Sequence, residues 1–472
     1  PCPERGNLSE HSVRLHYADW LKYFFKAMLH QNMSAALRAG SQALIYCVQA
    51  EAWEQLSDFA SLLVTSIGNP QQLAALLPHL HTAVEAVPAG RLRWVCLCYL
   101  ADVRRNANQP DLSLPYYQQA AILARTTAEA GSNGAQAWYD LSTINHNWAI
   151  ALVMSGKFDA ARQCYRESIE AMKQARCPAV HIIGNELEIW HIDIMQHPAE
   201  LVRSEIEARL VQVQQWWEQY RTGQAVPEAP NAEMLARTFI RALGVAQQAD
   251  TACRDWLSAL GRLDATLEVQ RILCRSEEEL NVTRFNRANV LLRFPDRLDE
   301  ARAELETCLV LFQNNSDIRA KVRRALADLH YQQNDLPQAV AQVRRALVLK
   351  TSPDPVESFV LHANLALYLV RLDPSSNFTE ASRHQLASLL YCFVAGLNHN
   401  LQTLLNQYAS TFHRSQAAGT APAIPRVAEL LADPAFAPLV AWLSERKVDV
   451  ATLQIEIDML LEQVRQYVMQ NQ

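Results

Sequence analysis

The chain has 472 residues, a length that exceeds one compact domain and fits several domains or one long repeat array. Its formal net charge of -6 provides no overall electrostatic attraction to nucleic acid or to anionic membranes. Glycine is scarce, at 13 residues, while Ala, Leu, Gln, Glu and Arg dominate, so the composition favours helices over strands and we expect an all-α protein.

The ten cysteines are scattered and fall mostly in apolar helical stretches. Disulfide frameworks belong to small secreted domains that lack an adequate core, so we expect free thiols and a cytoplasmic protein. No apolar run reaches the roughly 18 to 20 residues of a membrane helix, and no signal-peptide pattern occurs, so no membrane partner is expected. The start at Pro1, without methionine, favours a fragment of a longer polypeptide, with residues 1–10 as a linker.

From His11 onward, pairs of amphipathic helical stretches follow one another. Each pair carries large and small apolar residues at helical spacing, although the second pair has lost its alanine pattern. The first three pairs cover residues 11–31 with 33–49, 52–66 with 70–87, and 92–106 with 112–130.

The fourth pair has the clearest pattern. Its turn lies at Gly156, and Phe158, Ala161 and Tyr165 follow at the spacing of one helix face. This hairpin resembles a tetratricopeptide repeat (TPR), with Gly156 at the turn glycine, Phe158 and Tyr165 at the aromatic positions and Ala161 at the packing alanine. Asn145, on the first helix of the pair, is then a candidate for the groove or the core.

The repeat pattern fades after this hairpin. Residues 179–221 predict two long helices that are split near His197 and Pro198, and the second helix carries the adjacent pair Trp216 and Trp217. Residues 222–231 contain two prolines and a glycine and predict a loop, which is either a hinge between two halves or a long connection within one array.

Repeats resume in the second half. We expect a hairpin turn at Gly261, between residues 256 and 263, and packing alanines at Ala301 and Ala339, which lie 38 residues apart, close to the repeat period of about 34. A last unit joins 359–372 to 378–397 through a turn at 373–377. Residues 417–425 predict a loop, and the amphipathic stretch 448–467 predicts a helix that caps the array.

These patterns predict a right-handed superhelical α-solenoid. Its parts are a linker (1–10), an N-terminal repeat half (11–221), a loop or hinge (222–231), a C-terminal repeat half (232–415), and a final segment of loop and capping helices (416–472). Because stacked hairpins curve, the first helices of the pairs line a concave groove, and we expect a protein or peptide to bind there.

The degenerate repeats, rich in Ala, Leu, Gln and Trp, also resemble the C-terminal sensor regions of bacterial signal-transduction ATPases with numerous domains, the STAND class. This resemblance implies a sensor in signalling or bacterial defence, which contacts an upstream domain of the same chain. A freestanding TPR adaptor and a helical nucleic-acid-binding protein are the alternatives. A P-loop module encoded directly upstream would indicate the sensor, and a start codon near Pro1 would indicate the adaptor.

No motif for catalysis or for a cofactor stands out. Ser155-Gly156-Lys157 lacks the upstream glycine of a phosphate-binding loop. Glu188 and His191 have the spacing of a metal-binding helix, but no second Glu-x-x-His occurs. We therefore expect no catalytic residue, no metal and no cofactor in this segment, although a parent protein could carry an ATPase or effector domain.

Two groups of residues are candidates for partner binding. Positive charge is concentrated on one hairpin, and this face is either an ordinary solvated surface or a docking patch for an acidic partner. Its basic residues are Arg319, Lys321, Arg323, Arg324, Arg344, Arg345 and Lys350. Nucleic acid is a weaker alternative, because interleaved aromatic residues are missing. Trp216 and Trp217 point about 100° apart on a helix, so they pack in the core or expose one ring for docking.

Overall fold

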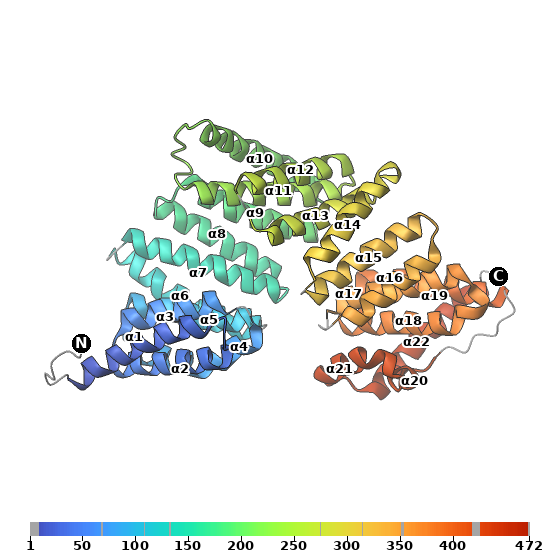
Figure 1. Cartoon of the computed structure of the whole chain (residues 1–472), viewed down its shortest axis with the longest axis horizontal. Helices are drawn as coiled ribbons and strands as arrows, with labels where there is room; N and C mark the ends of the chain where they lie inside the picture. Colours follow the sequence, from blue (N-terminus) through green and yellow to red (C-terminus); the bar gives the residue numbers. More distant parts are fainter. Residues whose placement is uncertain are drawn as a thin grey trace. The chain divides into compact units, whose positions relative to one another are not determined.

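A computed structural model describes residues 9–67, 69–107, 109–131, 134–273, 275–313, 315–350, 354–417 and 425–470. Throughout these ranges the chain forms α-helices, two short 3-10 helices and connecting loops, with no strand (Figure 1). Most of the expected N-terminal linker, residues 1–8, and most of the expected loop at 417–425, residues 418–424, lie outside the described residues.

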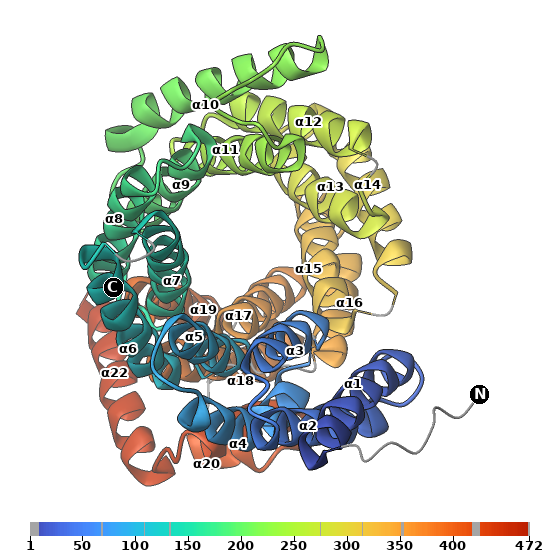
Figure 2. The same ribbon diagram turned by 90° about the vertical axis from the view of Figure 1, so that its left-hand side faces the viewer.

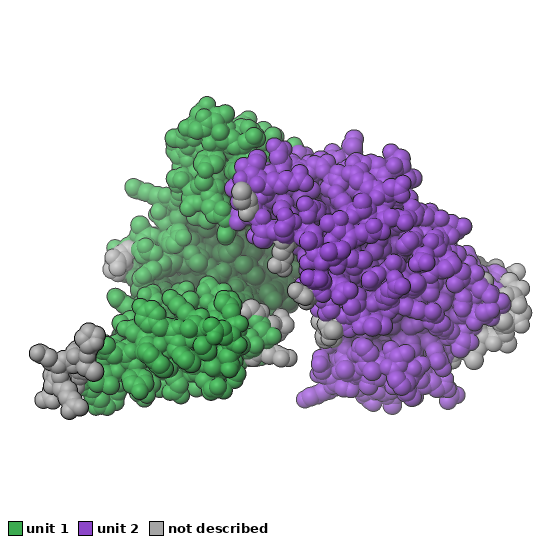
Figure 3. All heavy atoms as spheres, viewed as in Figure 1, with its two compact units in different colours: residues 1–255 green, residues 256–472 purple. Residues whose placement is uncertain are grey.

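The chain divides into two compact units, residues 1–255 and 256–472 (Figure 3). The helices of the first unit are α1 (Glu10–Met28), α2 (Met33–Gln49), α3 (Trp53–Ser66), α4 (Pro70–Ala86), α5 (Arg91–Asn106), α6 (Pro110–Glu129), α7 (Gly134–Met154), α8 (Phe158–Gln174), α9 (Ala179–Gln196), α10 (Glu200–Arg221) and α11 (Ala232–Ala252).

The second unit begins with helix pairs and ends with shorter helices. Its elements are α12 (Trp256–Ile272), α13 (Glu277–Leu291), η1 (Pro295–Arg297), α14 (Leu298–Leu311), α15 (Ser316–Gln332), α16 (Leu336–Leu349), α17 (Pro355–Leu372), α18 (Pro374–Val394), α19 (Asn398–Ala417), α20 (Val427–Leu431), η2 (Pro434–Phe436), α21 (Ala437–Glu445) and α22 (Val450–Gln470).

Within each unit, consecutive helices pack as hairpins, and neighbouring hairpins stack. In the first unit, α5, α7, α9 and α11 lie along one side of the stack and α6, α8 and α10 along the other (Figure 2). In the second unit, α15 with α16 and α17 with α18 form tight hairpins. Both units are therefore TPR-like helical arrays, as the repeat pattern of the sequence predicts.

The α7–α8 hairpin shows how the sequence makes one repeat. Gly156 adopts φ +70°, a left-handed conformation that costs glycine little. It lets the Lys157 N–H donate to the Leu152 carbonyl at 2.8 Å and so ends α7 in a Schellman motif. Phe158 then starts α8, and Ala161 and Tyr165 are buried against α7 and α9. Ala301 and Ala339 are likewise fully buried in the second unit.

Two expected turns are wrong. Gly261 lies inside the continuous helix α12, because glycine in a helix interior costs only about 1 kcal/mol and Leu260 and Leu263 are buried on that helix. The turn expected at 373–377 is a single residue, Asp373. Its carboxylate accepts hydrogen bonds from the Ser375 and Ser376 N–H groups, and with Pro374 in the first turn α18 starts at once.

Two other expected features lie where the sequence places them. Residues 222–231 connect α10 to α11 as a loop inside the first unit, and their role as a hinge stays a prediction. The C-terminal stretch forms α22, and Leu453, Ile457 and Leu461 are buried in one cluster with residues of α18 to α21. This last helix therefore covers the end of the second unit.

A pair of histidines lies at the junction of α17, α18 and η2. The His362 and His384 Nδ1 atoms are 2.9 Å apart, so one ring donates and the other accepts. The His362 ring also stacks on Tyr391 and on Phe436, with ring centroids 5.9 and 5.7 Å away. Burial, together with the neighbouring His384, lowers the pKa of His362 well below its usual range.

Among the described residues, the charged groups of this region lie beside His384, the less buried of the two histidines. His384 Nε2 is 3.8 Å from the Glu380 carboxylate, which also accepts from Arg344 of α16 at 2.7 Å. The hydrogen bonds from His384 and from Arg344 lower the pKa of Glu380 to about 2. On the side of η2, Asp433 is paired with Arg383 at 3.1 Å. The inner ring, His362, therefore meets the His384 imidazole and two aromatic rings.

The His362 pair predicts a pH dependence of stability. The folded protein keeps His362 neutral, whereas the unfolded chain binds a proton there below pH about 6.5. The free energy of unfolding should therefore fall as the pH drops from 7 to 5, with a slope from this residue of up to about 1.4 kcal/mol per pH unit. His362→Phe should flatten this slope by one proton, as measured by urea unfolding at several pH values.

The exposed His11 of α1 supplies the control, because His11→Phe should leave the slope unchanged. An equal slope in the wild type and in His362→Phe would contradict the assignment.

Candidate functional site

The described part of the first unit contains a groove of about 300 Å³ along one side of its helix stack. Three neighbouring helices supply most of its wall, and α8 contributes one residue from below. The lining residues are Tyr139, Ser142, Thr143 and His146 of α7, Met172 of α8, His181, Gly184, Asn185 and Glu188 of α9, and Met234, Arg237, Thr238 and Arg241 of α11.

The three helices contribute in the same pattern. On each of α7, α9 and α11, the lining positions are i, i+3, i+4 and i+7, which form one face of a helix. Because other faces of these helices pack against neighbours in the stack, this face is left open to a ligand. The groove is therefore built from three equivalent helix faces.

The floor of the groove is buried and combines the apolar Met172 with the polar Ser142, Asn185 and Thr238. Met172 is 9% exposed, and the fully buried Tyr165 meets the His146 ring edge-on at a centroid distance of 5.6 Å. Apart from the backbone of α9 itself and the residues on either side, no described atom lies within 4 Å of the place that a Cβ would take at Gly184. The open space in the groove therefore comes partly from the missing side chain at Gly184.

The hydrogen bonds of Asn185 fix the tautomer of His146. The Asn185 amide nitrogen faces two acceptors, the Met172 sulfur at 3.3 Å and the His181 carbonyl at 3.4 Å. Its amide oxygen must then accept the bond from His146 Nδ1, at 2.9 Å. Neutral His146 therefore carries its proton on Nδ1, and Nε2 is left as a hydrogen-bond acceptor.

The charged side chains of the groove are paired within the protein. Arg241 donates to both Glu188 carboxylate oxygens, at 2.8 and 2.7 Å, and Arg237 donates to Glu233 at 2.7 Å. Burial lowers the pKa of His181, so this ring stays neutral at physiological pH. The groove is thus close to electrically neutral and combines fixed polar groups with thioether and aromatic surface.

Asn145, which the sequence indicates for the groove or the core, is fully buried and is not one of the lining residues. Neither its amide nitrogen nor its amide oxygen has a hydrogen-bond partner among the described residues. Its neighbour His146 lines the groove instead.

Trp216 and Trp217 are 7% and 2% exposed, so both lie in the core of the first unit. The Trp217 ring packs against Tyr220 and Phe239, at centroid distances of 5.8 and 6.1 Å. These positions favour packing over docking for the tryptophan pair.

The arginines of the α15–α16 hairpin do not form one uniform patch. Arg324 is paired with Glu357 at 2.8 Å, and Arg344 with Glu380 at 2.7 Å. Arg319 and Arg323 donate instead to neutral oxygens, the Gln313 carbonyl at 3.3 Å and the Gln342 amide oxygen at 2.7 Å. Arg345 is exposed. Carboxylates thus neutralise Arg324 and Arg344, whereas no described carboxylate pairs with Arg319, Arg323 or Arg345.

The residues considered for metal binding have other partners. Glu188 is held by Arg241, and His191 Nδ1 is 2.5 Å from the Gln248 amide oxygen. Over the ranges that the structure describes, no group of three or more His, Cys, Asp or Glu side chains could hold a metal ion. The eight described cysteines are free thiols, and burial raises the pKa of Cys96 to about 11 and of Cys164 to about 12.

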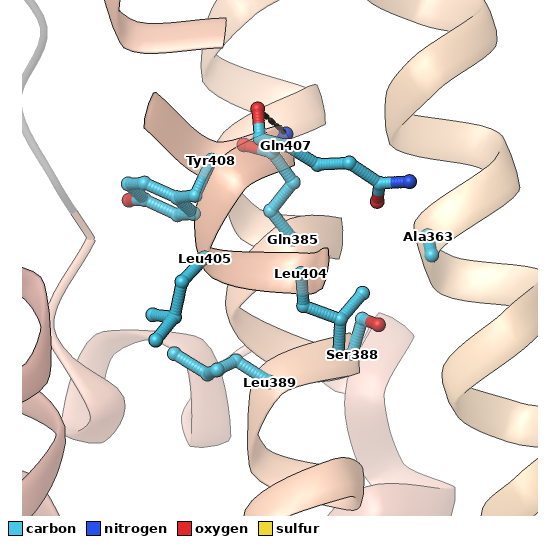
Figure 4. A pocket seen from close by; sticks show the side chains of 8 residues that line it. All are labelled: Ala363, Gln385, Ser388, Leu389, Leu404, Leu405, Gln407 and Tyr408. Carbon is cyan, nitrogen blue, oxygen red and sulfur yellow. Dashed lines mark hydrogen bonds between the residues drawn. The ribbon is translucent and has the colours of Figure 1, made fainter. Parts of the chain in front are cut away.

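The second unit contains a small void of about 10 Å³ between α17, α18 and α19. Figure 4 shows Gln385, Gln407 and Tyr408 on one side and the leucines of α18 and α19 on the other. The Gln385 amide donates to the Thr411 hydroxyl at 2.6 Å. A space of this size holds about one water molecule, so it is no ligand site.

No described helix is both long enough and apolar enough to cross a membrane.

The sequence did not single out the groove residues, apart from Glu188. Their signal is the i, i+3, i+4, i+7 set of polar and thioether side chains on α7, α9 and α11. That signal can be read only when it is known which helices lie side by side.

The contrast between two asparagines gives a prediction. A buried amide without partners costs about 1 to 3 kcal/mol, so Asn145→Leu should raise the free energy of unfolding by about 1 kcal/mol. Asn185→Leu should lower it by about 1 to 3 kcal/mol, because it leaves the His146 Nδ1–H group without its acceptor. Urea unfolding of both variants measures this, and destabilisation by Asn145→Leu would show that its amide has a partner.

No family model and no curated protein matches the chain. Among solved structures, it is similar to a TPR protein from Parabacteroides merdae, with 13% identity, a TM-score of 0.42, and coverage of 67% of this chain and 99% of that one. A STAND protein with a TPR sensor from Pyrococcus horikoshii matches with 11% identity and a TM-score of 0.45, over 98% of this chain and 56% of that one. Yeast Tom70 matches with 11% identity and a TM-score of 0.38, over 94% and 99%. Matches at this level carry no information on function.

Proposed function

We propose that the chain is a protein-interaction scaffold, and that the α7–α9–α11 groove binds a peptide segment or a small ligand. The observation that supports this most directly is the groove itself, which is open, partly apolar and lined by side chains already fixed by internal hydrogen bonds. Concave sites that combine apolar surface with a few fixed polar groups are typical of ligand binding.

The balance of charge indicates what kind of ligand the groove takes. Because Glu188 and Arg241 satisfy each other, a charged ligand would have to break a bidentate ion pair without a new counter-charge. A largely uncharged segment can instead use the His146 Nε2 acceptor and place an apolar side chain against Met172 and Met234. We therefore propose an uncharged, partly apolar ligand.

We further propose that the chain is the sensor part of a larger STAND-type signalling protein, in which ligand capture by the repeats controls an upstream module. The resemblance in repeat style supports this role. The gene distinguishes the alternatives, because a P-loop module in the same reading frame upstream is expected for a sensor. A start codon at the codon before Pro1 would instead indicate a freestanding adaptor.

Gly184 allows the groove to be filled without disturbing the fold. Since a side chain at Gly184 would project into open space, Gly184→Leu should block the groove and also stabilise α9 by about 0.5 to 1 kcal/mol. Peptides selected from a random displayed library against the wild-type chain should bind this variant at least about tenfold more weakly in isothermal titration calorimetry, because leucine occupies their volume.

Gly261 of α12 provides a matched control. It also lies in a helix interior with open space at the Cβ position, but it belongs to the second unit and is not a groove residue. Gly261→Leu should therefore keep the wild-type affinity. Equal affinity of the selected peptides for Gly184→Leu and the wild type would rule out this groove as their site.

A further inference from the structure

The hairpin formed by α15 and α16 carries more arginines than there are described carboxylates paired with them. Arg324, Arg344 and Lys350 each have a carboxylate within 4.0 Å, from Glu357, Glu380 and Asp317 respectively. Arg319, Arg323 and Arg345 have no carboxylate within that distance among the residues that the structure describes. We call these three residues the arginine triad.

The triad lies together on the hairpin. Arg319 and Arg323 are one turn apart on α15, so their side chains share a face. Arg323 donates across to Gln342 of α16 at 2.7 Å, and Arg345 follows Gln342 by three residues on the same helix. The contact between the two helices thus brings all three guanidinium groups to one region.

The three charges repel one another. Partial burial, together with the charges of Arg345 and Arg319, lowers the pKa of Arg323. The Arg319 Nε atom is buried and has no hydrogen-bond partner among the described residues. Guanidinium groups in this situation gain both hydrogen bonds and Coulomb energy when an anion binds.

We propose that the arginine triad is a docking site for an acidic segment of a partner protein. Charge complementarity carries this proposal, since the site has three unneutralised donors with fork geometry, which suits the two oxygens of a carboxylate. This site lies in the second unit and is independent of the groove in the first.

The surroundings of the triad favour a polypeptide over a nucleic acid. Val348, one turn after Arg345, is 86% exposed and offers an apolar contact. Tyr331 is the nearest large aromatic residue of α15 and α16, but its ring stacks on Tyr368 at 4.8 Å and lies under Arg371 at 5.0 Å. Both faces of the Tyr331 ring are thus occupied, and this ring is not free to stack on a base. An acidic segment with a few apolar residues fits both features of the surface.

Fluorescence polarisation with a defined probe tests the proposal. The probe is a short fluorescein-labelled peptide of glutamates with two leucines, and its control replaces every glutamate by glutamine. The full chain should bind the acidic peptide at low ionic strength, bind it more weakly at physiological salt, and not bind the glutamine peptide. Arg345→Gln and Arg323→Gln should each weaken binding about fivefold.

Arg344→Gln is the matched control, because it changes the same charge on the same helix at a residue whose guanidinium already has a carboxylate partner. It should weaken binding by less than about twofold. Arg345 is exposed and no described carboxylate pairs with it, so Arg345→Gln gives a folded variant even if Arg323→Gln destabilises the hairpin.

Three results would overturn the proposal. One is the absence of binding of the acidic peptide at low ionic strength. Another is an equal loss of affinity in Arg344→Gln and Arg345→Gln, which would show that only the overall charge matters. The third is tighter binding of an oligothymidine probe than of the acidic peptide, which would assign the triad to nucleic acid.

Discussion

The structure depends on the close packing of helices at small residues. A single amphipathic hairpin cannot bury its apolar face, so each hairpin is stable only when a neighbour covers it. Ala161, Ala301 and Ala339 are fully buried at these contacts, where a larger side chain would force the helices apart. The alanines thus determine how closely successive hairpins approach, and the approach determines which helix faces stay open.

The groove of the first unit follows from this packing. Once the stack has covered the other faces of α7, α9 and α11, the remaining face of each helix points toward the same open space. Polar side chains there are tolerated because they pair with one another, as Glu188 does with Arg241 and His146 with Asn185. These internal pairs hold the groove in one conformation before a ligand arrives, which lowers the ordering cost of binding.

The sequence predicted the all-α fold and the repeat class because both depend on local patterns. Local patterns failed where two glycines look alike. Gly156 ends a helix, whereas Gly261 lies inside one. What distinguishes them is the packing of the residues that follow, which the local sequence does not show. The groove was out of reach for another reason, because its residues come from helices separated by loops. The partners of Arg324 and Arg344 are 33 and 36 residues away in the sequence, so the charge pattern alone could not show which arginines are neutralised.

Charge pairing also explains how one scaffold can carry two surfaces with different chemistry. In the groove, Arg237 and Arg241 each have a carboxylate partner, so only shape and hydrogen bonds remain to select a ligand, and these depend little on salt. Arg319, Arg323 and Arg345 have no such partner among the described residues, and their charges attract anions over a longer range and speed the association of anions. The neutral groove is therefore suited to discriminating between ligands, whereas the arginine triad is suited to recruiting an acidic partner.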